Sequence, residues 1–248
     1  MKHLWYCILI AVCFLCGCSV SHEQEGAGLP VDAISKTWES SASFEWEQME
    51  NRTPAAQEAA KTDNGTFYVL QDGSPSVLLW DGTQAVFLDW NAVTPRGVDL
   101  QAVPAPWNPE QTAVVFLSGT GTGISVYELH VVERLADGPG YREYVLPPDA
   151  GQAAIMEDLA VKRRGSTLRL QIGAQELTLS LPEELPDAEL APGGLHYEMG
   201  AQGIQLAAEF DWVSPSTNVT LPAMTVTARV QLEKEQFLLD AIALAEDF

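Results

Sequence analysis

The sequence predicts a mainly β protein: a β-rich α+β fold of antiparallel meanders with one or two short helices packed on them. Short runs of β-branched and aromatic residues recur along the chain, and Asp-Gly pairs typical of hairpin turns separate several of them. Apolar residues with a helical period stand out in one segment, which follows residue 148. Strands should therefore dominate the fold.

The first predicted strands form a three-stranded meander, "TFYVL", "SVLLW" and "AVFLDW", with turn signals at Asp72-Gly73 and Asp81-Gly82. A proline-rich crossing over residues 93–111 leads to two more strands, "TAVVFLSG" and "ISVYELHVVE". Later strand-like runs are "TLRLQI", "ELTLSL", "LHYEM", "GIQLAAEF", "MTVTARVQL" and "FLLDAIAL".

The strongest helix signal is "DAGQAAIMEDLAVKRRG", with Asp149 as a candidate N-cap and the basic run Lys162–Arg164 at its C-terminal end. Its expected apolar face consists of Ala153, Met156, Leu159 and Ala160. Short helices are also expected around residues 31–39 and 54–61. The aromatic residues expected to pack this N-terminal region onto the main body are Trp38, Phe44 and Trp46.

The N-terminus has the pattern of a bacterial lipoprotein signal. Lys2 and His3 precede the apolar run Leu4–Phe14, which is shorter than the ~20 residues of a membrane-spanning helix. The residues "LCGC" then resemble a lipobox that ends at Cys18. We therefore expect a signal peptide over residues 1–17, a lipid on Cys18 and a flexible tether to residue 30. Residues 31–248 form one extracytoplasmic domain, with a sub-boundary near 148–165 left open.

Charge and cysteine content limit the function. The chain carries 13 Lys and Arg against 34 Asp and Glu, a net charge of −21, which argues against a nucleic-acid partner because that partner requires a basic face. All four cysteines lie at or before Cys18, so the folded body has neither a disulfide nor a thiol nucleophile. The expected membrane contact is the lipid on Cys18, which places the exported protein at the outer face of the cell membrane.

The segment "SGTGTG" contains Gly119, Gly121 and Gly123. A P-loop requires a lysine and a following helix, and a dinucleotide fingerprint requires a final G-x-x-G spacing; both are missing. The glycines indicate a tight connection between two antiparallel strands. The alternative, that their backbone amides also line a ligand site, stays open.

The run "GTGTGISVYELHVVE", preceded by "SVLLWDGTQAVFLDW", resembles a group of lipoproteins and extracellular domains of Gram-positive bacteria. The resemblance covers about residues 66–133 and implies a β-rich fold outside the cell, without implying an activity. Members often carry an acidic, glycine-rich loop similar to the calcium loops of FG-GAP repeats. Here Asn108 and Glu110 are the only comparable oxygen ligands, whereas calcium takes six to eight, so we expect no metal.

Catalytic motifs such as G-x-S-x-G and H-E-x-x-H are missing, and no cofactor is expected. The most informative pair is His130 with Glu128, which share one strand face at i and i−2, where the carboxylate would orient the imidazole or raise its pKa. The simpler interpretation is a buried histidine whose partner lies on a neighbouring strand. The acidic pairs Glu183-Glu184 and Asp187 with Glu189 are expected to be solvated surface charge.

The sequence thus predicts a lipid-anchored cell-envelope protein that binds or scaffolds an unspecified envelope ligand or protein. The alternative is an envelope hydrolase acting on cell-wall glycan or peptide, with His130 and nearby acids in its site. A transport-associated solute binder fits less well, because such binders have two α/β lobes and the required alternation of strand and helix periods is missing.

Overall fold

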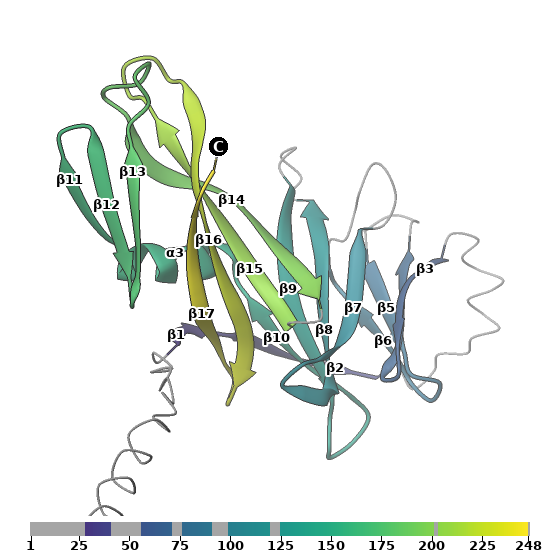
Figure 1. Cartoon of the computed structure of the whole chain (residues 1–248). Coiled ribbons are helices and arrows are strands. Elements are labelled where there is room, and N and C mark those ends of the chain that lie inside the picture. Colours follow the sequence, from purple (N-terminus) through teal and green to yellow (C-terminus); the bar gives the residue numbers. More distant parts are fainter. Residues whose placement is uncertain are drawn as a thin grey trace, which may run out of the picture.

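The computed structural model describes residues 28–40, 56–70, 76–90, 99–119, 125–200 and 203–247. Within these ranges the chain forms 17 strands and one α-helix, arranged in four antiparallel sheets, so the mainly β prediction is confirmed. Figure 1 shows the sheets following one another along an elongated molecule.

The four sheets are the central sheet, the outer sheet, the long sheet and the hairpin sheet. The central sheet contains β2 (Ile34–Glu39), β10 (Gly140–Leu146), β9 (Ser125–Arg134), β8 (Asn108–Gly119) and β7 (Leu100–Ala105), in that order. The outer sheet contains β3 (Ala56–Thr62), β4 (Gly65–Leu70), β5 (Ser76–Trp80) and β6 (Ala85–Leu88). The long sheet contains β1 (Leu29–Asp32), β17 (Gln236–Glu246), β16 (Thr220–Glu233), β15 (Gly203–Val213) and β14 (Glu189–Gly200). The hairpin sheet contains β11 (Ala160–Arg164), β12 (Thr167–Ile172) and β13 (Gln175–Ser180).

The central sheet is buried on both faces, which explains the continuous apolar run "AVVFL" of β8. Leu129 and Val131 face a large core shared with the long sheet, the hairpin sheet and the helix. Val132 faces a second core, the sandwich core, between the central and outer sheets. Because successive residues of a strand point to opposite faces, His130 also faces the sandwich core.

The sandwich core is built mainly from aromatic and aliphatic side chains of two sheets. Phe67 and Leu79 of the outer sheet and Val114 and Phe116 of the central sheet are at most 1% exposed. Burying side chains of this size contributes about 2 kcal/mol each. The stacked rings of Trp90 and Phe116, with centroids 5.2 Å apart, extend this core toward His130.

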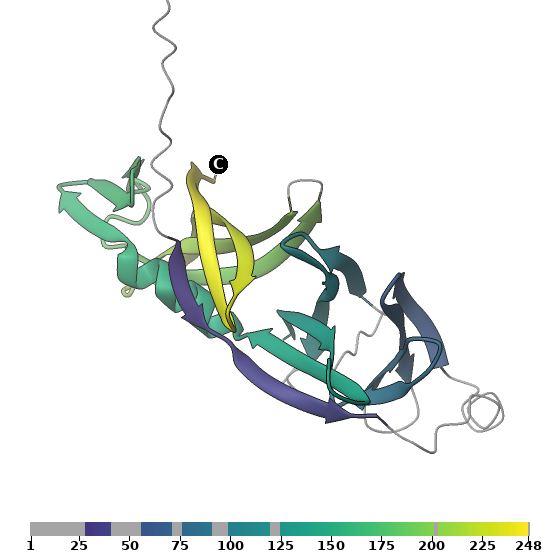
Figure 2. The same ribbon diagram turned by 90° about the horizontal axis from the view of Figure 1, so that it is seen from below.

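One N-terminal ribbon joins the two halves of the molecule. β1 pairs with β17 of the long sheet, and β2 pairs with β10 of the central sheet after the single intervening residue Ala33. Figure 2 shows this purple ribbon running along both sheets. The expected helices at residues 31–39 and 54–61 are therefore wrong, because pairing with existing strand edges determines their conformation. Within the latter range, residues 56–61 belong to β3.

The predicted helix is present as α3 (Pro148–Asp158), but its boundaries and face differ from expectation. Pro147 is the N-cap, without a side-chain hydrogen bond, and Asp149 lies in the first turn. Gly151, Ile155 and Leu159 are its buried positions, spaced by four residues. The expected face of Ala153, Met156, Leu159 and Ala160 is thus shifted, and only Leu159, which is the C-cap, is buried. The basic run Lys162–Arg164 does not cap the helix, since it lies in the exposed strand β11.

Most predicted strands are confirmed, including the meander β4–β6 and the six runs after residue 166. Gly82 adopts φ 89°, as its turn signal predicts, whereas Asp72-Gly73 lies outside the described residues. The proline-rich crossing contains the strand β7 and the start of β8. β10 was missed, because charged residues interrupt "GYREYVL".

Candidate functional site

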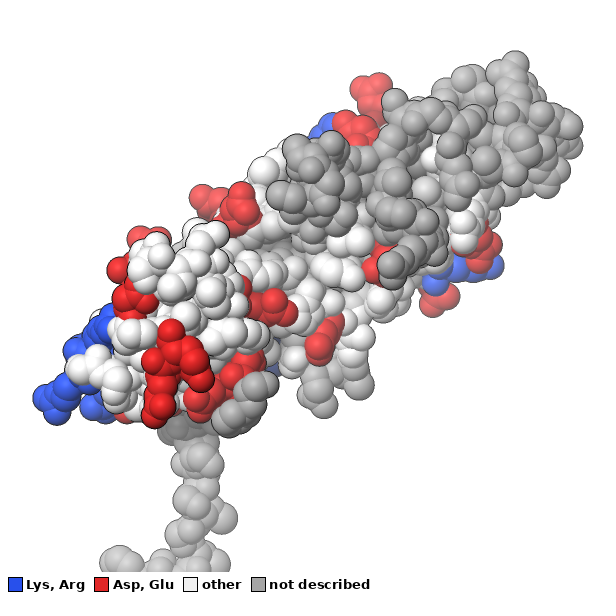
Figure 3. All heavy atoms as spheres, turned by 90° about the horizontal axis from the view of Figure 1, so that it is seen from above, with Lys and Arg blue, Asp and Glu red and all other residues white. Residues whose placement is uncertain are grey.

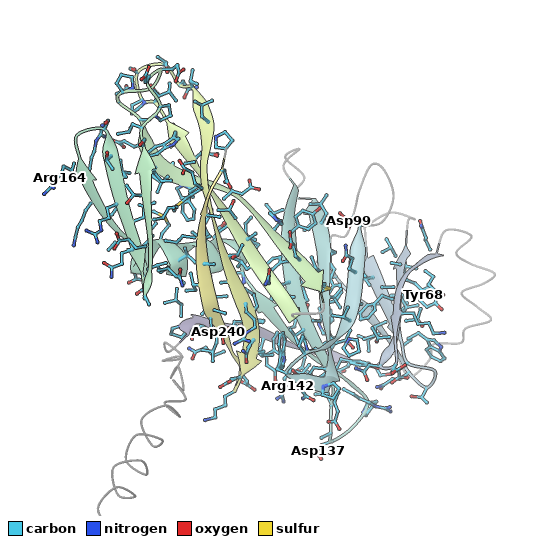
Figure 4. All side chains as sticks on the ribbon, in the orientation of Figure 1. Tyr68, Asp99, Asp137, Arg142, Arg164 and Asp240 are labelled. Carbon is cyan, nitrogen blue, oxygen red and sulfur yellow. The ribbon has the colours of Figure 1, made fainter. Side chains whose placement is uncertain are left out.

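A cleft of about 620 Å³ lies between the central sheet, the start of α3, and β14 and β15 of the long sheet. This volume falls within the range of small-molecule sites. The lining residues come from segments far apart in the sequence and are Asp99, Gln101, Val115, Val126, Tyr127, Pro148, Asp149, Gln152, Gly193, Gly194, Leu195, His196, Tyr197 and Glu209. Figure 4 shows Asp99 beside the upper end of the central sheet.

The cleft is acidic. Asp99, Asp149 and Glu209 line it, and none of its lining residues is Lys or Arg. The Tyr127 hydroxyl donates a hydrogen bond to Asp99 Oδ2 at 3.0 Å, and this bond, with burial and the negative charge of Asp99, raises the pKa of Tyr127. A ligand entering the cleft therefore meets negative charge from three elements.

Tyr197 is the one lining residue whose buried polar atom has no partner among the described residues. The residue is 7% exposed, and its hydroxyl makes no hydrogen bond. Burial raises the pKa of Tyr197, and the negative charge of Glu128 raises it further, so the hydroxyl stays protonated at neutral pH. Buried hydroxyls are nearly always paired, with protein groups or with bound molecules.

An irregularity in β14 brings Glu209 to the cleft. The register of β14 against β15 shifts between Pro192 and Leu195, so Gly193 and Gly194 form a bulge. A Cβ on Gly194 would lie 2.5 Å from Oε2 of Glu209, so the missing side chain of Gly194 leaves room for this carboxylate beside the bulge. His196 Nδ1 lies 3.6 Å from Glu209 Oε1.

A second polar cluster, the His130 centre, lies inside the sandwich core and consists of His130, Glu128 and Glu143. His130 Nδ1 bonds to Glu143 Oε1 of β10, and His130 Nε2 lies 2.9 Å from Glu128 Oε2. The imidazole also packs against Trp90 and Phe116, with ring centroids 4.6 and 4.8 Å from its own. Both ring nitrogens are thus engaged in a residue that is 4% exposed.

The carboxylates determine the ionisation of His130. Burial alone would lower the pKa of His130, but hydrogen bonds to Glu128 and Glu143 and the charges of both carboxylates raise it above 6.5. Burial would likewise raise the pKa of Glu128, yet the hydrogen bond and charge of His130, with a hydrogen bond from Ser118, lower it. Both pKa shifts thus favour a charged His130 beside a charged Glu128.

Two tryptophans complete the environment of Glu143, which is 2% exposed. Trp38 Nε1 donates to Glu143 Oε2 at 2.6 Å, and Trp90 Nε1 donates to Glu143 Oε1 at 2.5 Å. Trp38 therefore packs onto the main body as expected. The other two expected docking residues, Phe44 and Trp46, lie outside the described residues.

The structure brings together Glu128 and His130, as their shared strand face predicts, and neither residue lines the cleft. Gly119 ends β8 and pairs with Ser125, so the glycine segment connects two antiparallel strands as expected. Gly121, Gly123 and Cys18 lie outside the described residues. Sequence reasoning missed Glu143 and the whole cleft, whose residues share no motif.

Asn108 and Glu110, the two residues compared above with calcium-loop ligands, belong to one short turn. In this turn the Glu110 backbone N–H donates a hydrogen bond to Asn108 Oδ1 at 3.1 Å. Across the described ranges, no three His, Cys, Asp or Glu side chains are grouped so as to hold a metal ion. The described part of the chain also contains no helix long and apolar enough to span a membrane.

Comparisons of the chain with protein-family models, curated proteins and solved structures gave no match. Functional inference therefore rests on the geometry of the cleft and of the His130 centre.

Proposed function

We propose that this protein is a lipid-anchored ligand-binding protein of the cell envelope, and that the cleft between the central and long sheets is its binding site. The observation that carries the proposal is the unpaired hydroxyl of Tyr197 in the wall of a cleft of about 620 Å³. A concave site with a few convergent polar groups is the usual form of a small-molecule site.

The position of the cleft supports this assignment. Its walls come from two sheets that share one continuous core, so a rigid scaffold holds Tyr127 of β9 and Tyr197 of β14 in the lining. Rigid walls favour binding because few side chains must be ordered when the ligand enters. The His130 centre is then part of the scaffold, because its ring nitrogens are already occupied by Glu128 and Glu143.

The cellular location in this proposal rests on the N-terminal sequence. A lipid on Cys18 would hold the domain at the outer face of the membrane, and the resemblance of residues 66–133 to Gram-positive lipoproteins agrees with that location. The proposed protein thus binds its ligand outside the cell. The envelope hydrolase remains an alternative prediction without a site in the described geometry.

A thermal-shift screen of polar small molecules against the full-length protein tests the binding site. The variants Gln101→Trp and Gln152→Trp place bulk in the cleft lining, while Gln171→Trp makes a matched change on an exposed residue of β12 outside it. We expect at least one compound to raise the melting temperature of the parent and of Gln171→Trp, and to have little effect on the two cleft variants. If every stabilising compound acts equally on all four proteins, or if none stabilises the parent, the cleft is not the binding site.

A further inference from the structure

We propose that the ligand of this cleft is an organic cation, a molecule carrying a protonated amine or a quaternary ammonium group. The inference deepens the proposed function and rests on it. Its basis is the juxtaposition of three carboxylates, two tyrosine rings and one unpaired buried hydroxyl in a single cleft.

The carboxylates supply the charge complementarity. Asp99 uses Oδ2 to accept from Tyr127, Glu209 lies 3.6 Å from His196, and Asp149 has no hydrogen bond or ion pair among the described residues. A protonated amine would form charge-assisted hydrogen bonds with these groups, which are stronger than neutral ones, and a quaternary ammonium would be attracted to them by charge alone. An anionic ligand would instead be repelled by all three.

The tyrosines supply the second, independent observation. The Tyr197 hydroxyl is unpaired among the described residues and has less than 1 Å² of accessible surface, so a ligand reaches it only when the cleft wall shifts. Its oxygen then accepts an N–H of an ammonium group, or its O–H donates to a ligand oxygen. Glu128 lies close enough for its negative charge to act on that hydroxyl. Tyr127 and Tyr197 also line the cleft, and the face of a tyrosine ring attracts a cation that lies over it.

No Lys or Arg side chain lines the cleft, so no basic side chain of the lining competes with a cationic ligand for the carboxylates. In the view of Figure 3, blue side chains gather mainly at the end of the molecule formed by the hairpin sheet, where Figure 4 places Arg164. That sheet carries Lys162, Arg163, Arg164 and Arg169, none of which lines the cleft. The negative charge of the cleft is therefore not neutralised by Lys or Arg of its own lining.

Matched pairs of probes isolate the role of charge. Calorimetric titration of the full-length protein compares 1,5-diaminopentane with 1,5-pentanediol, glucosamine with glucose, and choline with 3,3-dimethylbutanol, because the members of each pair differ mainly in the cationic nitrogen. We expect at least one amine to bind at least ten-fold more tightly than its neutral counterpart. Its affinity should fall as salt increases, since the cleft carboxylates are partly exposed.

Substitution of single carboxylates tests whether the amine binds in the cleft. Asp149→Asn and Glu209→Gln should each weaken the amine about ten-fold or more, a loss near 1.4 kcal/mol. Asp158→Asn, on the exposed part of the same helix but outside the cleft, should bind as the parent does. Tyr197→Phe should also weaken binding, because the hydroxyl is lost while the ring remains.

The outcomes separate the two proposals. If a neutral compound binds as tightly as its amine, and Gln101→Trp abolishes both, the binding site stands and the cationic preference is overturned. The cationic preference is also overturned if Asp158→Asn weakens binding as much as Asp149→Asn does, or if about 1 mM calcium stabilises the protein as well as the amines do. If no probe or screened compound responds to Gln101→Trp or Gln152→Trp, the proposed function itself fails.

Discussion

Glu143 and His130 lie on the neighbouring strands β10 and β9, and their side chains bond to each other inside the sandwich core. Because both residues are at least 96% buried, their charges are compensated by each other and by close partners rather than by water. Trp38 and Trp90 bring the edge strand β2 and the residues after β6 to the same carboxylate. The His130 centre thus fastens the two sheets of the sandwich together.

Removing the charge of Glu143 should therefore destabilise the fold. We expect Glu143→Gln to lower the free energy of unfolding by about 3 kcal/mol, because the imidazolium loses one of its two carboxylates in a buried site. Urea denaturation measures the change, with Asp137→Asn in the exposed β9–β10 turn as control. A loss below about 0.5 kcal/mol, typical of a surface substitution, would contradict an ionic role for the centre.

The same cluster predicts a pH window for stability. The raised pKa of His130 contributes stability that is complete below 6.5 and is lost as pH rises through the folded pKa. The lowered pKa of Glu128 contributes stability that is complete above 4.5 and is lost as pH falls through the folded pKa. The difference in unfolding free energy between the parent and His130→Gln should therefore be greatest between pH 4.5 and 6.5. Denaturation curves across pH test this, and a difference that grows steadily toward alkaline pH would rule it out.

The hairpin between β9 and β10 offers a matched pair of glycines. Gly138 and Gly140 have φ of 130° and 131°, but a Cβ on Gly140 would clash with the Trp38 carbonyl oxygen, whereas one on Gly138 meets no atom within 4 Å. Both alanine variants bear the same backbone strain, and only Gly140→Ala forces β2 away from β10. We expect Gly140→Ala to melt at a distinctly lower temperature than Gly138→Ala. Equal melting temperatures would show that the close approach of Gly140 to the Trp38 carbonyl does not limit the stability of the fold.

The lipid anchor is tested separately from the fold. Cys18→Ala should release the protein from the membrane fraction, because the residue proposed to carry the lipid is lost, while its melting temperature stays at the parental value. Cys13→Ala, within the apolar run of the signal, should remain membrane-bound. Retention of Cys18→Ala in a detergent-extractable form would exclude Cys18 as the lipidated residue.

The sequence predicted well those features that depend on local pattern. The strand of His130 and its pairing with Glu128 follow from alternation along one strand, and the turn at Gly82 follows from a single dipeptide. β2 was mistaken for a helix because five of its six residues are exposed, so its conformation depends on pairing with β10 rather than on an apolar period.

Local patterns in the sequence do not predict the candidate site. Glu143 lies thirteen residues from His130, and recognising their contact requires the register of β9 and β10, which a strand broken by charged residues does not reveal. The cleft depends on where α3 and the β14 bulge lie relative to the central sheet. Asp99, Asp149 and Glu209 meet there through tertiary packing alone.

A crystal structure of the full-length protein with its strongest-binding amine tests the central claim most directly. The account predicts electron density for the ligand between Tyr127 and Tyr197, with its cationic nitrogen within hydrogen-bonding distance of at least one carboxylate among Asp99, Asp149 and Glu209. Density for the ligand elsewhere on the protein, with the Tyr197 hydroxyl still unpaired, would contradict it.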